Sequence, residues 1–600
     1  MKPKLTNEIL SARRALEKLK FYSLVSDLRW DENVRKWVLE CELRITSAPA
    51  AIPQATTWFV LIPEAYPSGD IDIYPAKASG VNKTFHHQNL NIDGDKSVQW
   101  RKGKICVNTP FGSLGRHGYD SEPVGGDERL CWHIKRAYEW LEAANSGQLI
   151  KKSDPFELPA ISFSEVLCIA FNESPEGLQD WMGSRSLSGY AAISRHKNSR
   201  LAFLTAIENI TGQTVTDAFE YGRGILDGIV STECAIWIRL KEIPVLPPWQ
   251  IPLTFGDLEG ILKAEGRDLI NELLLLAPQI RDGKAHFLLL GFPIPTHFGN
   301  RPDRLHWFAM RLPVLTSSNT KGFRSKERAF LSRDRILLSD KNRSLKWIET
   351  ENWNHDQLFS RIKDKGSLKN KKILLIGAGA VGSCVAQLCA RNAAEELLII
   401  DSQCLEAGNL CRHTLTLDNV GYHKAEQLSN QVNLSSTHIK SSYINKSLMD
   451  CNDKDLAQIK ECDVVLDCTG EDSVLRWLAN LEMPHSTLFS SISVSIRAKR
   501  LFYFSASSHI FPLVAFAEQI KSWLDDERKV LDKEGLPLPG IGCWHPIFPA
   551  GAEDIWIMTA IGAKLLMRDI ENPPTKPSLV VFEQDSNKGI FNEIREIKKS

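Results

Sequence analysis

The residues with the clearest chemical potential are three glycines, Gly377, Gly379 and Gly382, in the segment GAGAVG. They follow the apolar run KKILLI and precede SCVAQLCAR, a pattern typical of a strand, a tight turn and a helix. Glycines let backbone N–H groups approach a phosphate closely at the positive end of that helix. A second apolar run ends at Asp401, whose carboxylate could accept hydrogen bonds from a ribose. This spacing predicts a nucleotide site, for a dinucleotide or for ATP.

Polar side chains after Asp401 favour ATP. The segment EAGNLCRHTLTLDNVGYHKAEQL supplies Asn409, Arg412 and Lys424. Hydride transfer needs no such cluster, whereas nucleotidyl transfer needs cations where charge builds up on the phosphates. Either cation alone could equally belong to a solvated charged face. Their ordered combination favours nucleotidyl transfer.

Two carboxylates are candidate magnesium ligands. The run DVVLDCTGEDS is apolar up to Asp467, and Asp472 follows shortly after. Acids at strand ends are natural positions for magnesium beside a bound nucleotide. The sequence does not decide between the two.

A cysteine far downstream, Cys543, lies in the glycine-bounded segment PGIGCWHP. Adenylation of a carboxylate makes a mixed anhydride, which a thiolate can attack to form a thioester. His545 could activate the thiol by charge or hydrogen bonding. The alternative is a small buried hydrophobe, the fate that we expect for Cys384 and Cys389 on the glycine-loop helix. We predict a nucleophile at Cys543.

These motifs together resemble the ThiF-type activating domain, which ubiquitin-activating enzymes share with the enzymes that adenylate sulfur-carrier proteins. The resemblance spans about residues 365–600 and rests on the glycine motif, the ribose acid, N-L-x-R, G-x-x-K-A and D-x-T. The family often reads D-x-T-D-N where this chain has DCTGEDS, so Asp467 and Asp472 both remain candidates for Mg²⁺.

The resemblance also implies roles for single residues. The three glycines and Asp401 would hold ATP, and Asn409 and Lys424 would contact its phosphates. Arg412 would stabilise the departing pyrophosphate. In this family the acceptor cysteine lies after the nucleotide motifs, as Cys543 does, and a homodimer is expected.

A second candidate nucleophile, Cys106, lies near the other end of the chain. A helical pattern, extended runs, IPEAYPSGDIDIYP, HHQNLN and GKICVNTP together resemble a ubiquitin-conjugating enzyme. Cys106 matches its active-site cysteine, and His87-Gln88-Asn89 matches its H-P-N tripeptide without the proline. Asn89 would then stabilise an oxyanion, although it lies farther from the cysteine than is usual in that family. A degenerate copy that only binds is the alternative.

The order of the two segments is similar to that of bacterial fusion proteins found in CBASS antiphage operons. The resemblance implies that the activated carboxylate is the C-terminus of a cGAS-like nucleotidyltransferase. Cys543 would take it as a thioester and pass it to Cys106, and an amine of a target protein would receive it. Joining both cysteines in one chain makes the handover effectively intramolecular.

The elements that position these residues predict an α/β multidomain protein. Residues 1–155 should form an α+β ubiquitin-conjugating-like domain with a helix, an antiparallel meander and a second helix. The meander is expected from three extended runs, WVLECELRI, TTWFVLIP and GDIDIYP. Residues 156–350 mix strands with a helix near residues 257–276, in a linker or middle domain of unknown role. Residues 351–600 should form a doubly wound, Rossmann-like adenylation domain that carries the catalytic-cysteine segment.

Composition narrows the function classes. The chain has 600 residues, more than one core usually supports, and its 73 Lys and Arg balance 73 Asp and Glu. Such a balance offers no overall field for nucleic acid or an anionic membrane. Because no long apolar run or leader is visible, we expect a cytoplasmic protein. Thirteen cysteines without a C-x-x-C pair argue against a disulfide framework or a four-cysteine zinc site.

Three other functions compete. A sulfur-carrier activating enzyme usually has paired C-x-x-C zinc ligands and needs no N-terminal segment. A dinucleotide-dependent oxidoreductase would explain the glycine motif but not the cations. A scaffold with inactive domains would not be expected to keep both cysteines, Arg412 and Lys424.

Overall fold

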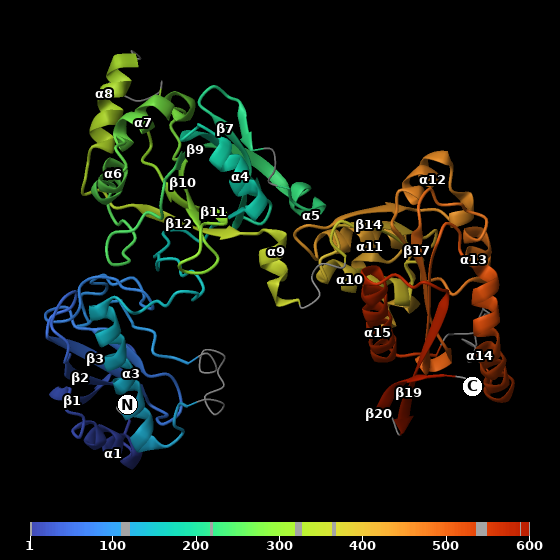
Figure 1. Ribbon diagram of the computed structural model, residues 1–600, viewed down its shortest axis with the longest axis horizontal. Helices are drawn as coiled ribbons and strands as arrows, with labels where there is room; N and C mark the ends of the chain where they lie inside the picture. The colour runs from blue at the N-terminus through green and yellow to red at the C-terminus, as the bar shows by residue number, and fades with distance from the viewer. Residues whose placement is uncertain are drawn as a thin grey trace. The chain divides into compact units, whose positions relative to one another are not determined.

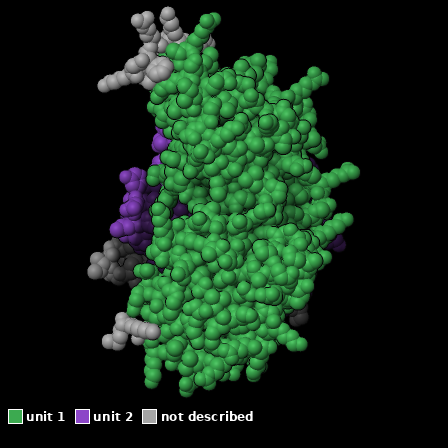
Figure 2. Space-filling view, turned by 90° about the vertical axis from the view of Figure 1, so that its left-hand side faces the viewer, with its two compact units in different colours: residues 1–194, 199–218, 232–351 green, residues 195–198, 219–231, 352–600 purple. Residues whose placement is uncertain are grey.

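Three β-sheets organise the chain in the computed structural model (Figure 1). The structure describes residues 3–109, 121–216, 220–317, 327–362, 368–535, 549–587 and 590–598. The chain forms two units, one of residues 1–194, 199–218 and 232–351 and one of residues 195–198, 219–231 and 352–600 (Figure 2). The third sheet lies wholly in the second unit.

The first sheet is an antiparallel meander in the order β1-β2-β3-β4. Its strands and the two flanking helices are α1 (Asn7–Leu16), β1 (Tyr22–Asp31), β2 (Lys36–Arg44), β3 (Ala55–Pro63), β4 (Asp72–Pro75) and α3 (Gly126–Ser146). The sequence predicted both helices and β2 to β4 but missed β1. That strand is an edge strand whose alternate side chains are only half-buried, so it lacks the apolar run that marks the other three.

The second sheet closes on itself, because β5 pairs with both β12 and β7. Its order is β5-β12-β11-β10-β9-β6-β7-β8. The strands are β5 (Cys168–Phe171), β6 (Ser188–His196), β7 (Leu201–Asn209), β8 (Thr214–Thr216), β9 (Ile229–Arg239), β10 (Phe287–Ile294), β11 (Arg304–Arg311) and β12 (Lys346–Asn352). The helices are α4 (Pro175–Gly183), α5 (Arg223–Leu226), α6 (Phe255–Ala264), α7 (Leu269–Leu276), α8 (Glu327–Leu338) and α9 (His355–Leu358).

The single helix expected near residues 257–276 is wrong, since α6 and α7 are separate helices. Gly266 lies between them with φ +78°, a left-handed conformation that ends a helix. Asp268 then caps the next helix by accepting from the backbone N–H of Asn271. These two local features interrupt the single helix that the apolar periodicity predicts.

The third sheet has the doubly wound, Rossmann-like order that the sequence predicted, β15-β14-β13-β16-β17-β18-β19-β20. The five strands from β15 to β17 run parallel, and β18 to β20 continue antiparallel. Its strands are β13 (Lys372–Ile376), β14 (Glu396–Ile400), β15 (Lys440–Ile444), β16 (Val464–Asp467), β17 (Thr487–Val494), β18 (Arg500–Ser508), β19 (Ser578–Asn587) and β20 (Ile590–Ile597). Its helices are α10 (Ala380–Arg391), α11 (Lys424–Asn433), α12 (Asp453–Lys460), α13 (Asp472–Leu478), α14 (Leu513–Glu534) and α15 (Ala552–Glu571).

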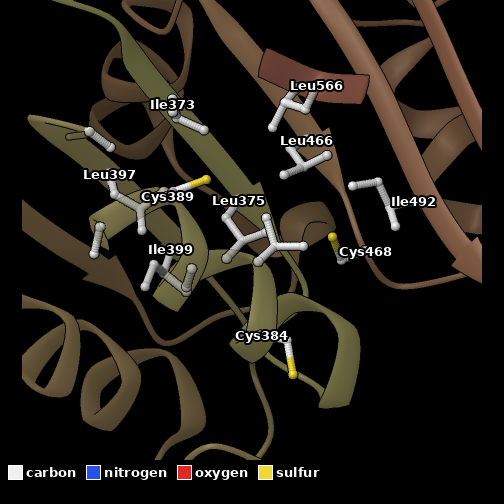
Figure 3. Packing of buried hydrophobic residues seen from close by; sticks show 14 of the residues in the cluster. Ile373, Leu375, Cys384, Cys389, Leu397, Ile399, Leu466, Cys468, Ile492 and Leu566 are labelled. Atoms are coloured by element: carbon white, nitrogen blue, oxygen red, sulfur yellow. The ribbon is translucent and has the colours of Figure 1, made fainter. Parts of the chain in front are cut away.

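Buried aliphatic side chains pack α10 and α15 against this sheet (Figure 3). Cys384 and Cys389 lie in this core and are 0% and 3% exposed, which confirms the expectation that they are buried hydrophobes. Burial also raises the pKa of both thiols to about 12, which disfavours the nucleophilic thiolate form. The core thus fixes the glycine-loop helix on the sheet.

Candidate active site

A cavity of about 620 Å³ opens in the third sheet's unit, where β13, β16 and β17 end. Six of the predicted site residues line it, from four separate segments of the chain: Gly379, Asn409, Arg412, Lys424, Asp467 and Asp472. The fold therefore brings together side chains that are up to 93 positions apart between Gly379 and Asp472. Gly377, Gly382 and Asp401 shape the loop that borders the cavity.

The three glycines differ in how much room the fold leaves for a side chain. Gly377 has φ +90°, and a Cβ there would lie 2.8 Å from Thr469 Cγ2. A Cβ on Gly382 would lie 1.9 Å from the backbone oxygen of Gly377, so only glycine fits. Gly379 begins α10 without a side-chain cap, and a Cβ there would meet nothing within 4 Å. The open space at Gly379 is a cradle where a phosphate can reach the helix N-terminus.

Asp401 connects the tip of β14 to the glycine loop. One carboxylate oxygen accepts from the backbone N–H of Ala378 at 2.7 Å, and the other accepts from that of Gln403 at 2.7 Å. Each oxygen has a second lone pair, so the carboxylate can still accept from a ribose hydroxyl. The ribose role stays a prediction.

The cations come from the segment after Asp401. Lys424 is the first residue of α11, is 6% exposed, and its Nζ donates to Gln403 Oε1 at 2.8 Å. Within the described ranges no carboxylate forms an ion pair with this ammonium. Asn409 and Arg412 lie on the short 3-10 turn Ala407–Cys411 and directly after it. A largely buried lysine that lines the cavity and has no carboxylate partner among the described residues fits an anionic group such as a triphosphate.

Two residues that we did not predict from the sequence hold the site residues in place. Gln403 positions Lys424, as described above. His413 follows Arg412; its Nε2–H donates to Ala378 O at 2.7 Å, and its Nδ1 accepts from the backbone N–H of Leu415 at 3.0 Å. Burial lowers the pKa of His413, which favours the neutral imidazole, and the two hydrogen bonds require this tautomer. The feature of the sequence that could have identified His413 is its position immediately after Arg412.

The two candidate magnesium ligands have different surroundings. Asp467 is 1% exposed, and burial raises its pKa despite hydrogen bonds from Thr469 and Ser491. Its Oδ1 accepts two bonds from Thr469 and its Oδ2 accepts one, at 2.9 Å, from Ser491 Oγ. Asp472 is exposed at the start of α13. The described residues contain no group of three or more His, Cys, Asp or Glu side chains that could hold a metal by themselves.

In the first unit, Cys106 is exposed beside the predicted tripeptide. Gln88 and Ile105 form an antiparallel bridge, the N–H of Cys106 donates to His87 O at 2.7 Å, and that of Asn89 donates to Lys104 O. The intervening chain folds back on itself. The long spacing between Asn89 and Cys106 is thus compatible with a shared site.

Cys543 and His545 belong to residues 536–548, outside the described part of the chain. The helices before and after this segment, α14 and α15, are both in the second unit. The catalytic role of Cys543 therefore stays a prediction. Across the residues that the structure does describe, none of the helices combines the length and apolar character needed to cross a membrane.

Comparison with known proteins gives matches along nearly the whole chain. A family model described as the Cap2 central linker domain matches residues 147–353, and the ThiF family model matches residues 354–489. The ATP-dependent ubiquitin transferase-like protein Cap2 of Enterobacter hormaechei is 31% identical over 561 residues, which cover 92% of this chain and 91% of that protein.

Other matches are partial. The adenylyltransferase and sulfurtransferase UBA4 of Debaryomyces hansenii is 33% identical over 124 residues, covering 20% of this chain and 26% of that protein. The crystal structure of Escherichia coli MccB with AMPCPP and MccA is 16% identical with a TM-score of 0.29, covering 48% of this chain and 73% of that chain. That superposition is weak.

Proposed function

Because this chain belongs to the Cap2 family of ATP-dependent ubiquitin transferase-like proteins, we propose that it uses ATP to join a protein's C-terminal carboxylate to amines of target proteins. Its ThiF-family part makes it an ATP-dependent enzyme. The activated protein is a cGAS-like nucleotidyltransferase, and the reaction serves antiphage defence. The observation that carries the proposal is the largely buried Lys424, which lines the same cavity as the open cradle at Gly379.

The proposed division of labour follows three regions. Residues 1–155 form a ubiquitin-conjugating-like domain, which the helix, the meander and the exposed Cys106 after it support. Residues 156–350 are the middle domain, and residues 351–600 are the adenylation domain with the Cys543 segment.

In the first step, the carboxylate attacks the α-phosphorus of ATP and pyrophosphate leaves. Gly377, Gly379 and Gly382 let backbone N–H groups contact the phosphates, and Asp401 binds the ribose. Asn409 and Lys424 contact the phosphates. Arg412 stabilises the charge that builds up on the departing pyrophosphate.

In the second step, the Cys543 thiolate attacks the acyl carbon and AMP leaves, so that a thioester forms. The Cys106 thiolate then attacks that thioester and Cys543 is released. Finally an amine of the target protein attacks the Cys106 thioester, which forms an amide and frees the Cys106 thiol. Asn89 stabilises the oxyanion in that last step.

The adenylation step is tested by exchange of labelled pyrophosphate into ATP. The assay contains the purified protein, Mg²⁺ and a cGAS-like nucleotidyltransferase with its native C-terminus. Exchange is expected only with the intact C-terminus. Lys424→Ala should slow it roughly 10²- to 10³-fold, because a charge contact to the phosphates is lost. Lys460→Ala, an exposed lysine on α12, should leave it unchanged. Bound NAD together with an absence of exchange would instead favour an oxidoreductase.

We assign the Mg²⁺ contact to Asp467. Mg²⁺ would neutralise phosphate charge and orient the pyrophosphate. Ligating carboxylates are usually held by hydrogen bonds from neighbours, as Thr469 and Ser491 hold Asp467. Its Oδ2 accepts one such bond, which leaves a lone pair for a cation.

Asp467→Asn is therefore expected to raise the Mg²⁺ concentration needed for half-maximal exchange at least roughly tenfold, in line with the loss of a ligand. Asp472→Asn should change it less than about threefold, since this exposed side chain lies outside that hydrogen-bonded set. Magnesium titrations of both variants, with unfolding temperatures measured in parallel, check the assignment. A larger effect of Asp472→Asn than of Asp467→Asn would assign the Mg²⁺ contact to Asp472 instead.

A further inference from the structure

The segment beside Cys106 is held by residues of the middle domain. His87 N–H lies 3.1 Å from both carboxylate oxygens of Glu157, and His87 Nδ1 lies 3.3 Å from Glu157 Oε2. Glu157 belongs to the part of the chain that matches the Cap2 central linker model. The middle domain thus supplies a carboxylate to the histidine that precedes Gln88 and Asn89.

Aromatic packing fixes this contact. The ring of His86 lies over that of Trp249, with centroids 3.9 Å apart, and Phe298 contacts His86 edge-on at 5.4 Å. The backbone N–H of Trp249 donates to Thr84 O at 3.0 Å, and the Thr84 hydroxyl donates to Gln250 Oε1. The segment from Thr84 to His87 is therefore clamped from the middle domain on both its backbone and its rings.

The side chains of His87 and Cys106 are both accessible. Gln88 and Ile105 pair across the bridge and are 5% and 2% exposed, whereas Cys106 is exposed and the His87 side chain is 46% exposed. His87 and Cys106 are neighbours across this bridge, because the backbone N–H of Cys106 donates to His87 O at 2.7 Å. His87 also has φ +56°, a conformation unusual for a residue other than glycine.

The Glu157 carboxyl is suited to orient an imidazole. Burial acts to raise its pKa, but the neighbouring imidazoles of His86 and His87 and the N–H of His87 hold that pKa below its usual range. A carboxylate beside Nδ1 favours the tautomer with the proton on Nδ1. Nε2 is then the ring nitrogen that can accept a proton.

We propose that His87 accepts the proton of the attacking amine at Cys106, and that Glu157 of the middle domain positions His87 for this step. This inference rests on the proposed function, because it requires a Cys106 thioester. The middle domain would then be a working part of the conjugation site as well as a connector.

The amine nitrogen of the target bonds to the thioester carbonyl carbon, its proton moves to His87 Nε2, and the carbon–sulfur bond breaks. Cys106 leaves as a thiolate and takes the proton back from the imidazolium. An amide and a free thiol result, with no oxidation or reduction.

Other charged groups around His87 are engaged elsewhere. Lys104, across the bridge from Asn89, donates through Nζ to Asp72 at 2.9 Å. Arg136 on α3 donates through Nε to the carbonyl oxygen of Val107 at 2.6 Å. Among the residues that the structure describes, Glu157 is the titratable group that pairs with the His87 side chain, at 3.3 Å, and His86 shares that carboxylate partner.

The test separates loading of Cys106 from its discharge. The protein is first loaded with ATP, Mg²⁺ and a cGAS-like nucleotidyltransferase, and the Cys106 thioester is quantified by intact mass. ATP is then removed, free lysine is added, and loss of the thioester is timed between about pH 5.5 and 9. In the native protein the rate should show an inflection with pH where the imidazole loses its proton, since only neutral imidazole accepts a proton.

Three variants distinguish catalysis from structure. His87→Gly keeps the left-handed backbone, and we expect discharge at least about 10²-fold slower, without the histidine inflection. Added imidazole should restore part of the rate in His87→Gly but not in His87→Gln, which fills the same space. Glu157→Gln should move the inflection to lower pH, because the imidazolium loses its anionic neighbour.

Each outcome is decisive. If the native protein forms no Cys106 thioester, the proposed function fails. If the thioester forms but His87→Gly discharges with the native rate and pH profile, only the inference on His87 is overturned. A slow variant that keeps the native pH profile and ignores imidazole would also overturn it, since that behaviour indicates a structural role.

Discussion

Replacing Cys106 by serine is expected to trap the activated protein as an oxyester on residue 106. Serine forms an ester that amines attack more slowly than a thioester, so a short-lived intermediate should become a lasting adduct. Cys106 is exposed, as an acceptor that receives a whole protein must be. Intact mass measured with ATP and Mg²⁺, before and after mild base, should reveal a base-labile adduct with the mass of the activated protein.

The order in which Cys543 and Cys106 accept the carboxylate is tested by combining variants. Adding Cys543→Ala to the Cys106→Ser protein should abolish the adduct completely, because the first acceptor is gone. Cys131→Ser is a suitable control, since Cys131 is a half-buried residue on α3 with a raised pKa caused by burial. That change should leave native transfer intact. An adduct that persists without Cys543 would mean that residue 106 takes the carboxylate directly from the adenylate.

Gly382→Ala is expected to disable the nucleotide site by distorting the glycine loop. The added Cβ would be placed 1.9 Å from the backbone oxygen of Gly377 and 3.4 Å from Cys468 Cβ, in a packed core. Overpacking of this kind costs about 3 kcal/mol in the free energy of unfolding, and here the atom that must move is backbone. We expect a lower unfolding temperature and no detectable ATP binding by calorimetry.

Gly379→Ala provides the matched comparison. Its φ of −79° suits any residue, and its Cβ would meet no protein atom within 4 Å, so the unfolding temperature should hold. ATP binding should nevertheless weaken at least about tenfold, because the methyl group would occupy the cradle at the helix N-terminus. Normal ATP affinity in Gly379→Ala would show that the phosphate does not bind at this part of the loop.

The glycine loop could be predicted from the sequence because it is a local structure. A strand, a turn that only glycine permits and a helix follow one another in some twenty residues, and each leaves its own periodicity. The doubly wound sheet followed from repeating that unit. Edge strand β1, with its half-buried alternation, left no comparable apolar run and was missed.

What surrounds the reactive groups was decided by tertiary structure. By sequence alone Lys424 could equally belong to a solvated charged face, and only the structure shows that this residue is largely buried and donates to Gln403. The hydrogen bonds of Asp467 to Thr469 and Ser491 come from a turn and from a neighbouring strand. The sequence had left Asp467 and Asp472 as equal candidates.

By itself the sequence determined the nucleotide-loop type, the order of the motifs and the identity of both candidate nucleophiles, because these depend on residue types at short spacing. It did not reveal that the chain between Asn89 and Cys106 folds back to bring the two together, or that Glu157 reaches His87. Those contacts depend on how distant segments pack against one another. Burial, charge and proton positions at a site are set by that packing, and periodicity along the chain carries no record of it.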